Sequence, residues 1–522
     1  MAGNVHKGDR LGTMRLRHEH TNEIIKIPTP SNDPQDPLNW PQWYKYFVAG
    51  ISSWAILMST FCASGPAVIL PNMAITFFGP PGPHFAAAIS KASYFITVCA
   101  LMMGVSNLVW VPLMIKFGRR WVYILAYALY CGTAAWCATA ESYSSLLAAR
   151  AILGCAAGAG EVLGPLTIAD IFFVHERGAM MVIYTCMLSA GTSLGALVAG
   201  FITVNHSWRT FFWLSCALTG ATCVMIFFFF PETTYQRSSL NPPPDVVGPG
   251  PEKTSSEEAE YADDETSQAS IVVGSRPSFS KILATWPTKS FTSEPLWKLS
   301  LRPIVLIVLP SALWASLVMS VSIGFLIAMA SNISTAFSST YHFTTWQIGL
   351  SMIAGLVGSV VAIWFGGPLS DIIADHLTRL NGGLREPEMR LPAMAISLVT
   401  GPLALVLYGV GIGNELHWIC PIIGFALTGE VTMTQYTFKC NVKSLMMVFT
   451  SSLFGFLLSF YTNVWIQEQG YQQAFGEMAI ISGVIFLGLF IFYFFGGFLR
   501  RWSWEWSIMK LVHWEGDREV GE

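Results

Sequence analysis

Three ionisable residues stand inside long apolar segments, where they could carry chemistry. Arg150 and Glu161 belong to an apolar segment at 145–170, and Glu430 belongs to another at 418–438. Placing a charged side chain at the centre of a bilayer costs about 2.5–3.5 kcal/mol on insertion scales. A carboxyl group there can take up and release a proton or bind a cation, and a nearby guanidinium changes how readily it does so. The sequence therefore predicts proton-coupling or substrate-binding roles for these residues.

The spacing of the first two places them on one side of a helix. Arg150, Gly154, Ala157, Glu161 and Gly164 fall within about 80° of one another at 100° per residue. About 16 Å separates Arg150 from Glu161 along the axis, which is too far for a direct ion pair. We expect both to face one water-filled cavity. Two structural alternatives stay open: Arg150 could extend its head to the membrane edge, and a buried acid could be a protonated core residue.

Helices that span a membrane must position these residues. Of the 522 residues, 12% are charged and 53% are hydrophobic, whereas a soluble protein has about 25% charged residues. This composition excludes a large soluble enzyme, and a spanning helix needs about 20 apolar residues. The sequence predicts an all-α membrane protein with twelve such segments, which are 46–68, 93–115, 121–140, 145–170, 178–203, 209–230, 303–329, 347–369, 391–412, 418–438, 444–466 and 478–499.

The positive charges predict the orientation of these segments. With the N-terminus in the cytoplasm, all of the 29 Lys and Arg except Lys91, Arg150 and Arg209 fall in cytoplasmic segments or at their borders. Membrane proteins show this excess of Lys and Arg in cytoplasmic loops. We therefore expect both termini to be cytoplasmic.

The predicted helices form two sets of six, separated by a polar loop. The stretch 242–270 is rich in acidic residues, Pro, Gly and Ser, a composition typical of disorder. Six helices repeated twice favour a secondary transporter with its substrate site near the membrane midplane. The expected domains are a cytoplasmic N-terminal segment, a six-helix bundle, a cytoplasmic loop, a second six-helix bundle and a cytoplasmic tail, at 1–45, 46–230, 231–302, 303–499 and 500–522.

Several other functions lack support. A net charge of −3 creates no field that attracts nucleic acid, and the ten cysteines form no C-x-x-C pair. Phosphate-binding-loop and H-E-x-x-H motifs are absent from the sequence. We expect no enzyme activity, no metal and no cofactor, with a proton gradient as the energy source. The expected partners are a small-molecule substrate and the lipid bilayer, and the expected state is a monomer.

Residues at the predicted turns resemble the major facilitator superfamily. Its loop between the second and third helices reads G-x-L-x-D-R-x-G-R-[RK]. Gly118, Arg119 and Arg120 match the end of this motif, while Gly367 and Asp371 match its start in the second half. The segments 36–41, 168–178 with Asp170 and Arg177, 231–237 and 381–391 are similar to fungal multidrug-type members. The resemblance implies two pseudo-symmetric six-helix bundles around a central cavity, and export of a drug, toxin or secondary metabolite by proton-coupled alternating access, most simply at the plasma membrane.

The resemblance also implies roles for single residues. Arg150 matches an R-x-x-x-G element implicated in proton coupling. Gly191, Gly195 and Gly200 match most of an antiporter element, although Ala196 replaces its Pro. Aromatic and hydroxyl residues of the first and seventh helices would complete the cavity, with packing as an equally good explanation. These candidates are Trp54, Phe61, Trp314, Ser316 and Ser320.

Two alternatives to export remain open. One is proton-coupled import of a small polar or cationic nutrient, which Glu161 and Glu430 would also serve. The other is a transporter-like sensor that signals through the acidic loop. Asn205 and Asn332 head glycosylation sequons on the predicted outer face, close to helix ends.

Overall fold

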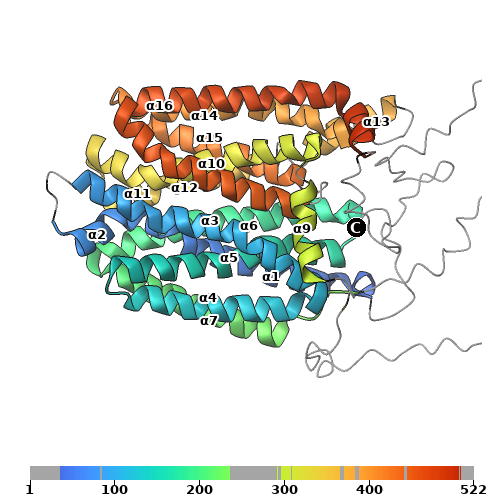
Figure 1. Cartoon of the computed structure of the whole chain (residues 1–522), viewed down its shortest axis with the longest axis horizontal. Helices are drawn as coiled ribbons and strands as arrows, with labels where there is room; N and C mark the ends of the chain where they lie inside the picture. Colours follow the sequence, from blue (N-terminus) through green and yellow to red (C-terminus); the bar gives the residue numbers. More distant parts are fainter. Residues whose placement is uncertain are drawn as a thin grey trace, which may run out of the picture.

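The computed structural model describes residues 36–80, 82, 85–235, 291, 295–306, 308–364, 369–381, 387–439, 444–504 and 506. Every regular element among these residues is a helix, and the long helices lie side by side along one direction (Figure 1). Within the described residues, ten helical stretches are long and apolar enough to cross a membrane. The predicted all-α membrane fold is confirmed.

The helices of the first half pack mainly on one another. Contacts join α3 with α5, α1 with α6, and α4 with α7 and α5. A short 3-10 helix, η1 (Pro37–Asn39), precedes them. The helices are α1 (Gln42–Ser64), α2 (Pro66–Phe78), α3 (Phe85–Phe117), α4 (Arg119–Thr139), α5 (Tyr143–Ile171), α6 (Val174–Asn205) and α7 (Trp208–Phe229).

The helices of the second half form a similar group. Contacts join α10 with α16, α12 with α15, and α14 with α15 and α16. The long helices are α10 (Pro310–Thr340), α11 (Thr345–Ser351) with α12 (Ile353–Trp364), α14 (Ala395–Gly413), α15 (Ile419–Lys439) and α16 (Ser444–Trp504). Three short elements lie near helix ends, namely α9 (Leu296–Leu306), α13 (Ser370–Leu380) and η4 (Pro387–Met394).

The bounds predicted for the first and the seventh span are wrong, and a proline lies at a helix start in each of these regions. The first span was expected at 46–68, but helix runs from 42 to 78 as α1 and α2, with a break at Gly65 and Pro66. The seventh was expected at 303–329, but α10 runs from 310 to 340. Proline is favoured at the first helical position, where its missing N–H is not needed, and Pro310 begins α10 there.

The last two predicted spans lie in α16, which consists of two helices that meet at a break. Gly470 inside α16 has a φ of 80°, in the left-handed region that glycine adopts readily. The residues on either side contain the spans predicted at 444–466 and 478–499.

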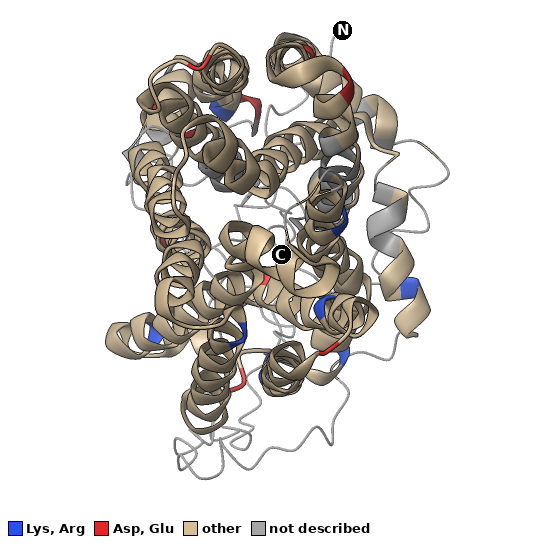
Figure 2. Cartoon of the chain, turned by 90° about the vertical axis from the view of Figure 1, so that its left-hand side faces the viewer, with Lys and Arg blue, Asp and Glu red and all other residues tan. Residues whose placement is uncertain are grey.

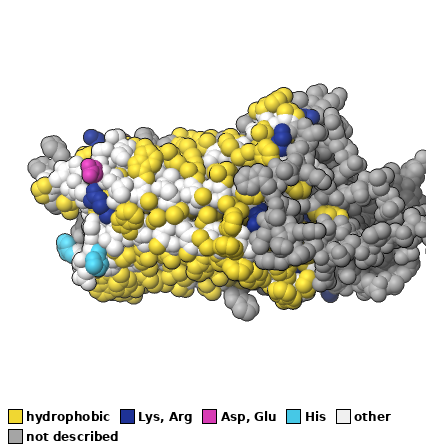
Figure 3. Space-filling model, turned by 90° about the horizontal axis from the view of Figure 1, so that it is seen from below, with side chains coloured by type: hydrophobic (Ala, Val, Ile, Leu, Met, Phe, Trp, Pro, Cys, Tyr) yellow, Lys and Arg dark blue, Asp and Glu magenta, His cyan; other side chains and the backbone are white. Residues whose placement is uncertain are grey.

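The surface of the helices suits a bilayer. Figure 2 looks along the helix axes, and few of the helical residues in this view are charged. In Figure 3 hydrophobic side chains spread over the length of one side, and the charged and His side chains lie toward the two ends. We call the end with the α3–α4 turn the Arg119 end, and the end with the α6–α7 turn the Ser207 end.

Candidate functional site

Arg150 repairs a backbone break in the neighbouring helix. Pro66 has no N–H, so the carbonyl of Cys62 lacks its usual partner four residues later. The guanidinium of Arg150 donates to this oxygen at 3.3 Å and to that of Ala63 at 2.7 Å. Its Nε donates to the carbonyl of Phe95 on α3 at 3.0 Å. Arg150 thus ties α5 to α3 and to the α1–α2 break.

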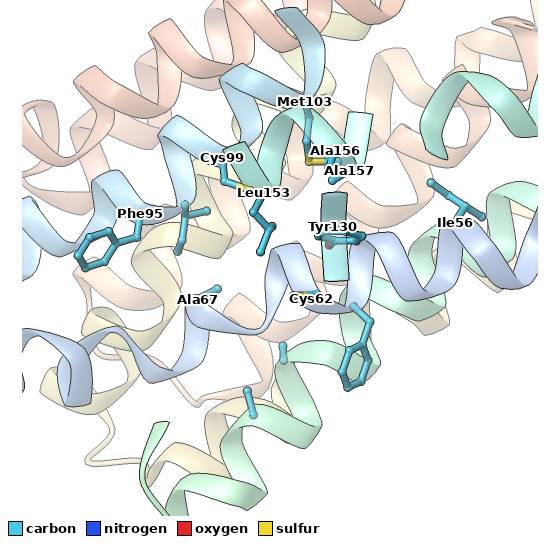
Figure 4. Close-up of a cluster of buried hydrophobic side chains, with 14 of the residues drawn as sticks. Ile56, Cys62, Ala67, Phe95, Cys99, Met103, Tyr130, Leu153, Ala156 and Ala157 are labelled. Atoms are coloured by element: carbon cyan, nitrogen blue, oxygen red, sulfur yellow. The ribbon is translucent and has the colours of Figure 1, made fainter. Parts of the chain in front are cut away.

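The surroundings of Arg150 are closed and largely apolar. Its side chain is fully buried, and the labelled cluster of Figure 4 includes Phe95, Cys62, Cys99 and Tyr130 around α5. Among the described residues its hydrogen bonds go to carbonyl oxygens, and none goes to a carboxylate. The prediction that it faces a water-filled cavity is wrong, and so is the alternative that it reaches the membrane edge.

Glu430 is a buried carboxyl group held by hydroxyls. It lies on α15 with 4% of its surface exposed. Its Oε2 is 2.8 Å from Oγ1 of Thr400 on α14, and its Oε1 is 3.2 Å from Oγ1 of Thr434 on its own helix. Among the described residues, its hydrogen-bond partners carry no positive charge. A buried carboxylate without a cation is costly, so this site suits the protonated acid better.

The hydroxyls beside Glu430 also have partners in their own helices. Oγ1 of Thr400 lies 3.1 Å from the carbonyl oxygen of Ile396 on α14, and Oγ1 of Thr434 lies 3.0 Å from the backbone oxygen of Glu430. A hydroxyl has one hydrogen and can also accept, so each can serve either a carboxylate or a protonated carboxyl group. The cost of burying a charge, rather than the number of hydrogens, therefore favours the protonated acid.

Glu161 has a different environment. It is half-buried on α5, and the hydroxyl of Tyr184 on α6 donates to its backbone carbonyl at 3.1 Å. The hydrogen bonds of Arg150 and Glu430 go to other groups, so the structure does not join the three predicted residues into one site. Two glycines of α5 permit close contact with α3: a Cβ added at Gly154 or Gly158 would lie within 2.4 Å of α3 backbone oxygens.

The aromatic candidates pack within their own halves. The indole of Trp54 donates to Thr222 on α7 at 3.2 Å. Phe61 stacks on Phe211, also on α7, with a centroid distance of 5.5 Å. Trp314 stacks on Phe492 of α16 at 4.7 Å. These contacts agree with the packing explanation for all three aromatic side chains.

The serine candidates are buried in α10. The hydroxyl of Ser320 donates to the carbonyl of Ser316 at 2.6 Å, which is an ordinary bond within a helix. The hydroxyl of Ser316 is itself buried without a hydrogen-bond partner in the described structure. Neither serine is exposed in this conformation, with Ser316 0% and Ser320 1% exposed.

A network at the Arg119 end fixes the α3–α4 turn. Gly118 has a φ of 92° and marks the start of α4. The carboxylate of Glu232, just after α7, accepts from the backbone N–H groups of Arg119 at 2.8 Å and Arg120 at 3.2 Å. A carboxylate favours a helix N-terminus because the first N–H groups are unpaired there. Sequence reasoning did not assign Glu232 this role, although the acid directly follows a predicted span.

The same end holds an ion pair between helices. Nε of Arg119 lies 3.0 Å from Oδ2 of Asp170, which joins α4 to the end of α5. Arg177 donates to the carbonyls of Phe172 at 3.0 Å and Ala169 at 2.6 Å, and so caps α5. These three predicted motif residues therefore lie together at the Arg119 end.

The second copy of the motif is described only in part. Asp371 lies in the first turn of α13. Gly367 is outside the described residues, as are the predicted acidic stretch 242–270 and most of both predicted terminal segments.

Three glycines of α6 permit close helix contacts. Added Cβ atoms at Gly191 and Gly195 would lie 2.3 Å and 2.2 Å from carbonyl oxygens of α1. At Gly200 the nearest atom is the carbonyl oxygen of Thr345 in the second half, 2.7 Å away. Gly191 and Gly195 thus let α6 pack closely on α1 of its own half, and Gly200 lets it pack on α11 of the other half.

Further contacts close the Ser207 end between the halves. Ser334 on α10 donates to the carbonyl of Val68 on α2 at 3.1 Å. Phe201 on α6 stacks on Trp346 of α11 with a centroid distance of 6.2 Å. Farther along α6, the hydroxyl of Ser189 lies 2.6 Å from that of Ser359 on α12.

The two sequons differ in access. Asn205 is exposed at the end of α6. Asn332 lies inside α10 with 6% of its surface exposed, and its side-chain oxygen accepts from the hydroxyl of Tyr471 at 3.1 Å. A buried, hydrogen-bonded amide is not available for a glycan, so the prediction for Asn332 is wrong. The cause is the greater length of α10.

Comparisons with known proteins agree with this architecture. Residues 53–442 match the family model described as Major Facilitator Superfamily. The chain is 22% identical to an uncharacterized MFS-type transporter of Schizosaccharomyces pombe, over 92% of this chain and 89% of the relative. It is 25% identical to the MFS-type transporter paaT of Penicillium rubens, over 94% and 88%.

A solved structure shows the same fold. It is the xylose transporter XylE from E. coli in a partially occluded inward open conformation, with a TM-score of 0.58 and 14% sequence identity. The similarity covers 86% of this chain and 99% of that chain.

Proposed function

Because this chain belongs to the major facilitator superfamily, a family of non-enzymatic membrane transporters, we propose that it is a proton-coupled exporter of small amphipathic organic compounds. The compounds would be drugs, toxins or secondary metabolites, carried by alternating access of a central site to the two sides. Transport of a small molecule follows from the family. The coupling ion, the direction and the chemical class of the substrate are the proposal.

Proton coupling is proposed because the buried carboxyl group of Glu430 has the hydroxyls of Thr400 and Thr434 as its side-chain partners among the described residues. While the site is dry, a proton on the carboxyl group removes the cost of a buried charge, and the hydroxyls of Thr400 and Thr434 lie within hydrogen-bond distance of it. When the halves move, water reaches α14 and α15 and can hydrate the carboxylate of Glu430. The free-energy cost of burying the ionised form is then removed. One carboxyl group can thus bind a proton in one conformation and release it in the other.

The proposed orientation places the Arg119 end in the cytoplasm. The cations there include Arg119, Arg120 and Arg177, and cytoplasmic ends of membrane helices are enriched in Lys and Arg. Both termini and the loop 231–302 would then be cytoplasmic. The proposed location is the plasma membrane, and the proposed state is a monomer.

Export is supported by the glycines of α6, which resemble the antiporter element and contact both halves. Import of a cationic nutrient is the second candidate. The half-buried carboxyl group of Glu161 favours it, since a partly accessible acid in the first half could bind a cation.

Flux into proteoliposomes with an imposed pH gradient tests these proposals. The probes are cationic, neutral and anionic amphipathic fluorescent dyes. In the wild type we expect dye to accumulate against the direction of proton flow. In Glu430→Gln we expect this accumulation to fall at least tenfold while dye exchange without a gradient continues, because the amide keeps the size and a donor but cannot titrate.

Glu477→Gln is the matched control. This acid on α16 is half-buried and accepts from the indole of Trp465 at 2.9 Å, so its loss should leave accumulation unchanged. Gradient-driven accumulation in Glu430→Gln at the wild-type level would refute the role of Glu430. Accumulation in the direction of proton flow would replace export by import, and Glu161→Gln should then abolish uptake of the cationic dye alone.

A further inference from the structure

The short helix α9 lies across the long helices at the Arg119 end. Figure 1 shows it running across their direction, and it contacts α3 of the first half and α16 of the second. Its 11 residues are too few to span a bilayer, which needs about 20. Leu299 is 3% exposed, and the hydroxyl of Ser300 donates to the carbonyl of Leu108 on α3 at 3.0 Å. One face of α9 is therefore bound to the protein.

The opposite face of α9 is apolar and uncovered among the described residues. Trp297 is 66% exposed and Leu301 is 46% exposed. At 100° per residue they point about 160° away from Leu299 on either side of the helix. Lys298 lies on the flank between the bound and the exposed face. Water is a poor environment for a large exposed indole beside a leucine.

Exposed apolar side chains also lie on the two long helices that α9 contacts. Val109, next to the carbonyl that binds Ser300, is 60% exposed on the apolar helix α3. On α16, Leu457 and Tyr461 are 52% and 51% exposed. A helix that lies beside such a surface, at the end of the spanning helices, is at the depth of the lipid headgroups. Tryptophan is enriched at this depth because its ring is apolar and its N–H is polar.

We propose that α9 is a membrane-surface helix that binds anionic phospholipids of the leaflet at the Arg119 end. Trp297 and Leu301 enter the boundary between headgroups and acyl chains. Lys298 on the flank binds lipid phosphate, and basic side chains near an anionic surface are attracted to it. Because α9 contacts α3 of the first half and α16 of the second, the lipid would bind where the two halves meet and move relative to each other during transport. The proposal does not depend on the substrate or on proton coupling.

Photo-crosslinking in nanodiscs tests the proposal on the full chain. The photoreactive residue benzoyl-phenylalanine replaces Trp297, and the nanodiscs contain phosphatidylcholine and phosphatidylserine in equal amounts. Intact-protein mass spectrometry then identifies each adduct. We expect lipid adducts, with phosphatidylserine about fivefold over phosphatidylcholine, and Lys298→Gln should reduce this ratio toward one.

Two matched positions calibrate the yield. Val109 on the side of α3 should give lipid adducts without preference for phosphatidylserine, and Glu141, exposed in the α4–α5 turn, should give almost none. The proposal is overturned if position 297 gives no more lipid adduct than position 141. It is equally overturned if the main product joins position 297 to residues 236–290 of the same chain or to a second copy. A persisting phosphatidylserine preference in Lys298→Gln would overturn the role of the lysine.

Discussion

At the scale of single residues, a side chain compensates for a missing backbone donor. Pro66 interrupts the first membrane-spanning segment, and Arg150 donates to the two carbonyls at the break. An arginine suits this place because its planar fork presents several donors in fixed directions. A lysine side chain is shorter and ends in a single nitrogen, so it cannot replace all three contacts to the carbonyls of α1 and α3.

Replacing Arg150 should therefore lower stability before it affects coupling. We expect Arg150→Lys to lower the thermal unfolding midpoint in detergent, and Arg150→Met to lower it further. Each buried carbonyl left without a donor costs about 1–3 kcal/mol. Arg209→Lys is the control, since Arg209 donates to one carbonyl, that of Ala140. A variant at position 150 with wild-type stability and lost gradient-driven transport would show that coupling is its main role.

The sequence identified the buried charges but not their partners. Arg150 and Glu430 were recognisable because ionised groups are rare in apolar segments. Their surroundings depend on which helices cross at that depth, and neither the Pro66 break nor the position of Thr400 relative to Glu430 is encoded in local spacing. The aromatic candidates could not be ranked from the sequence for the same reason, since tryptophan and phenylalanine are common in this chain and their packing partners depend on the fold.

At the scale of elements, the start of α4 depends on one glycine and one distant acid. Gly118 combines a positive φ with close contact, since a Cβ there would lie 2.4 Å from Oε2 of Glu232. Few L residues adopt this backbone conformation, and the carboxylate cannot move without leaving the N–H groups of Arg119 and Arg120.

Gly118→Ala is thus expected to destabilise the Arg119 end. We expect a loss of about 1–3 kcal/mol, measured as a lower unfolding midpoint, with faster hydrogen exchange at residues 114–122. The control is Gly178→Ala in α6, where no atom lies within 4 Å of the added Cβ and alanine favours helix. Equal effects of both substitutions would contradict the role given to the turn.

Element boundaries were predictable where composition changes sharply and not where proline divides an apolar run. The ends of α5 and α7 lie close to those expected. Helix α10 begins later and ends later because Pro310 starts it and no breaker follows before Thr340. The short α9 escaped prediction because its apolar residues looked like the start of the next span.

At the scale of the whole molecule, the contacts of α6 with α11 and of α2 with α10 close the Ser207 end between the halves. A Cβ added at Gly200 would lie 2.7 Å from the carbonyl oxygen of Thr345. A Cβ added at Gly349 would lie 3.2 Å from a backbone oxygen of α6. Small residues permit this approach, and a larger side chain would separate α6 from α11.

We expect Gly200→Val to shift the population toward a conformation open at the Ser207 end. Hydrogen exchange of residues 196–205 and 345–352 should become several-fold faster, while that of α4 stays unchanged. Gly132→Ala on α4 has no atom within 4 Å and serves as the control. Unchanged exchange in Gly200→Val would mean that this contact does not hold the end closed.

The buried guanidinium of Arg150 also has a consequence for the electrical behaviour of the protein. Its three carbonyl partners belong to α1 and α3, so the charge travels with these helices whenever they tilt. A full charge moved across the whole bilayer is worth about 2.3 kcal/mol per 100 mV. Tilting the first half therefore carries part of an elementary charge through the membrane field. Membrane voltage then biases the conformational equilibrium even when the transported compound is neutral.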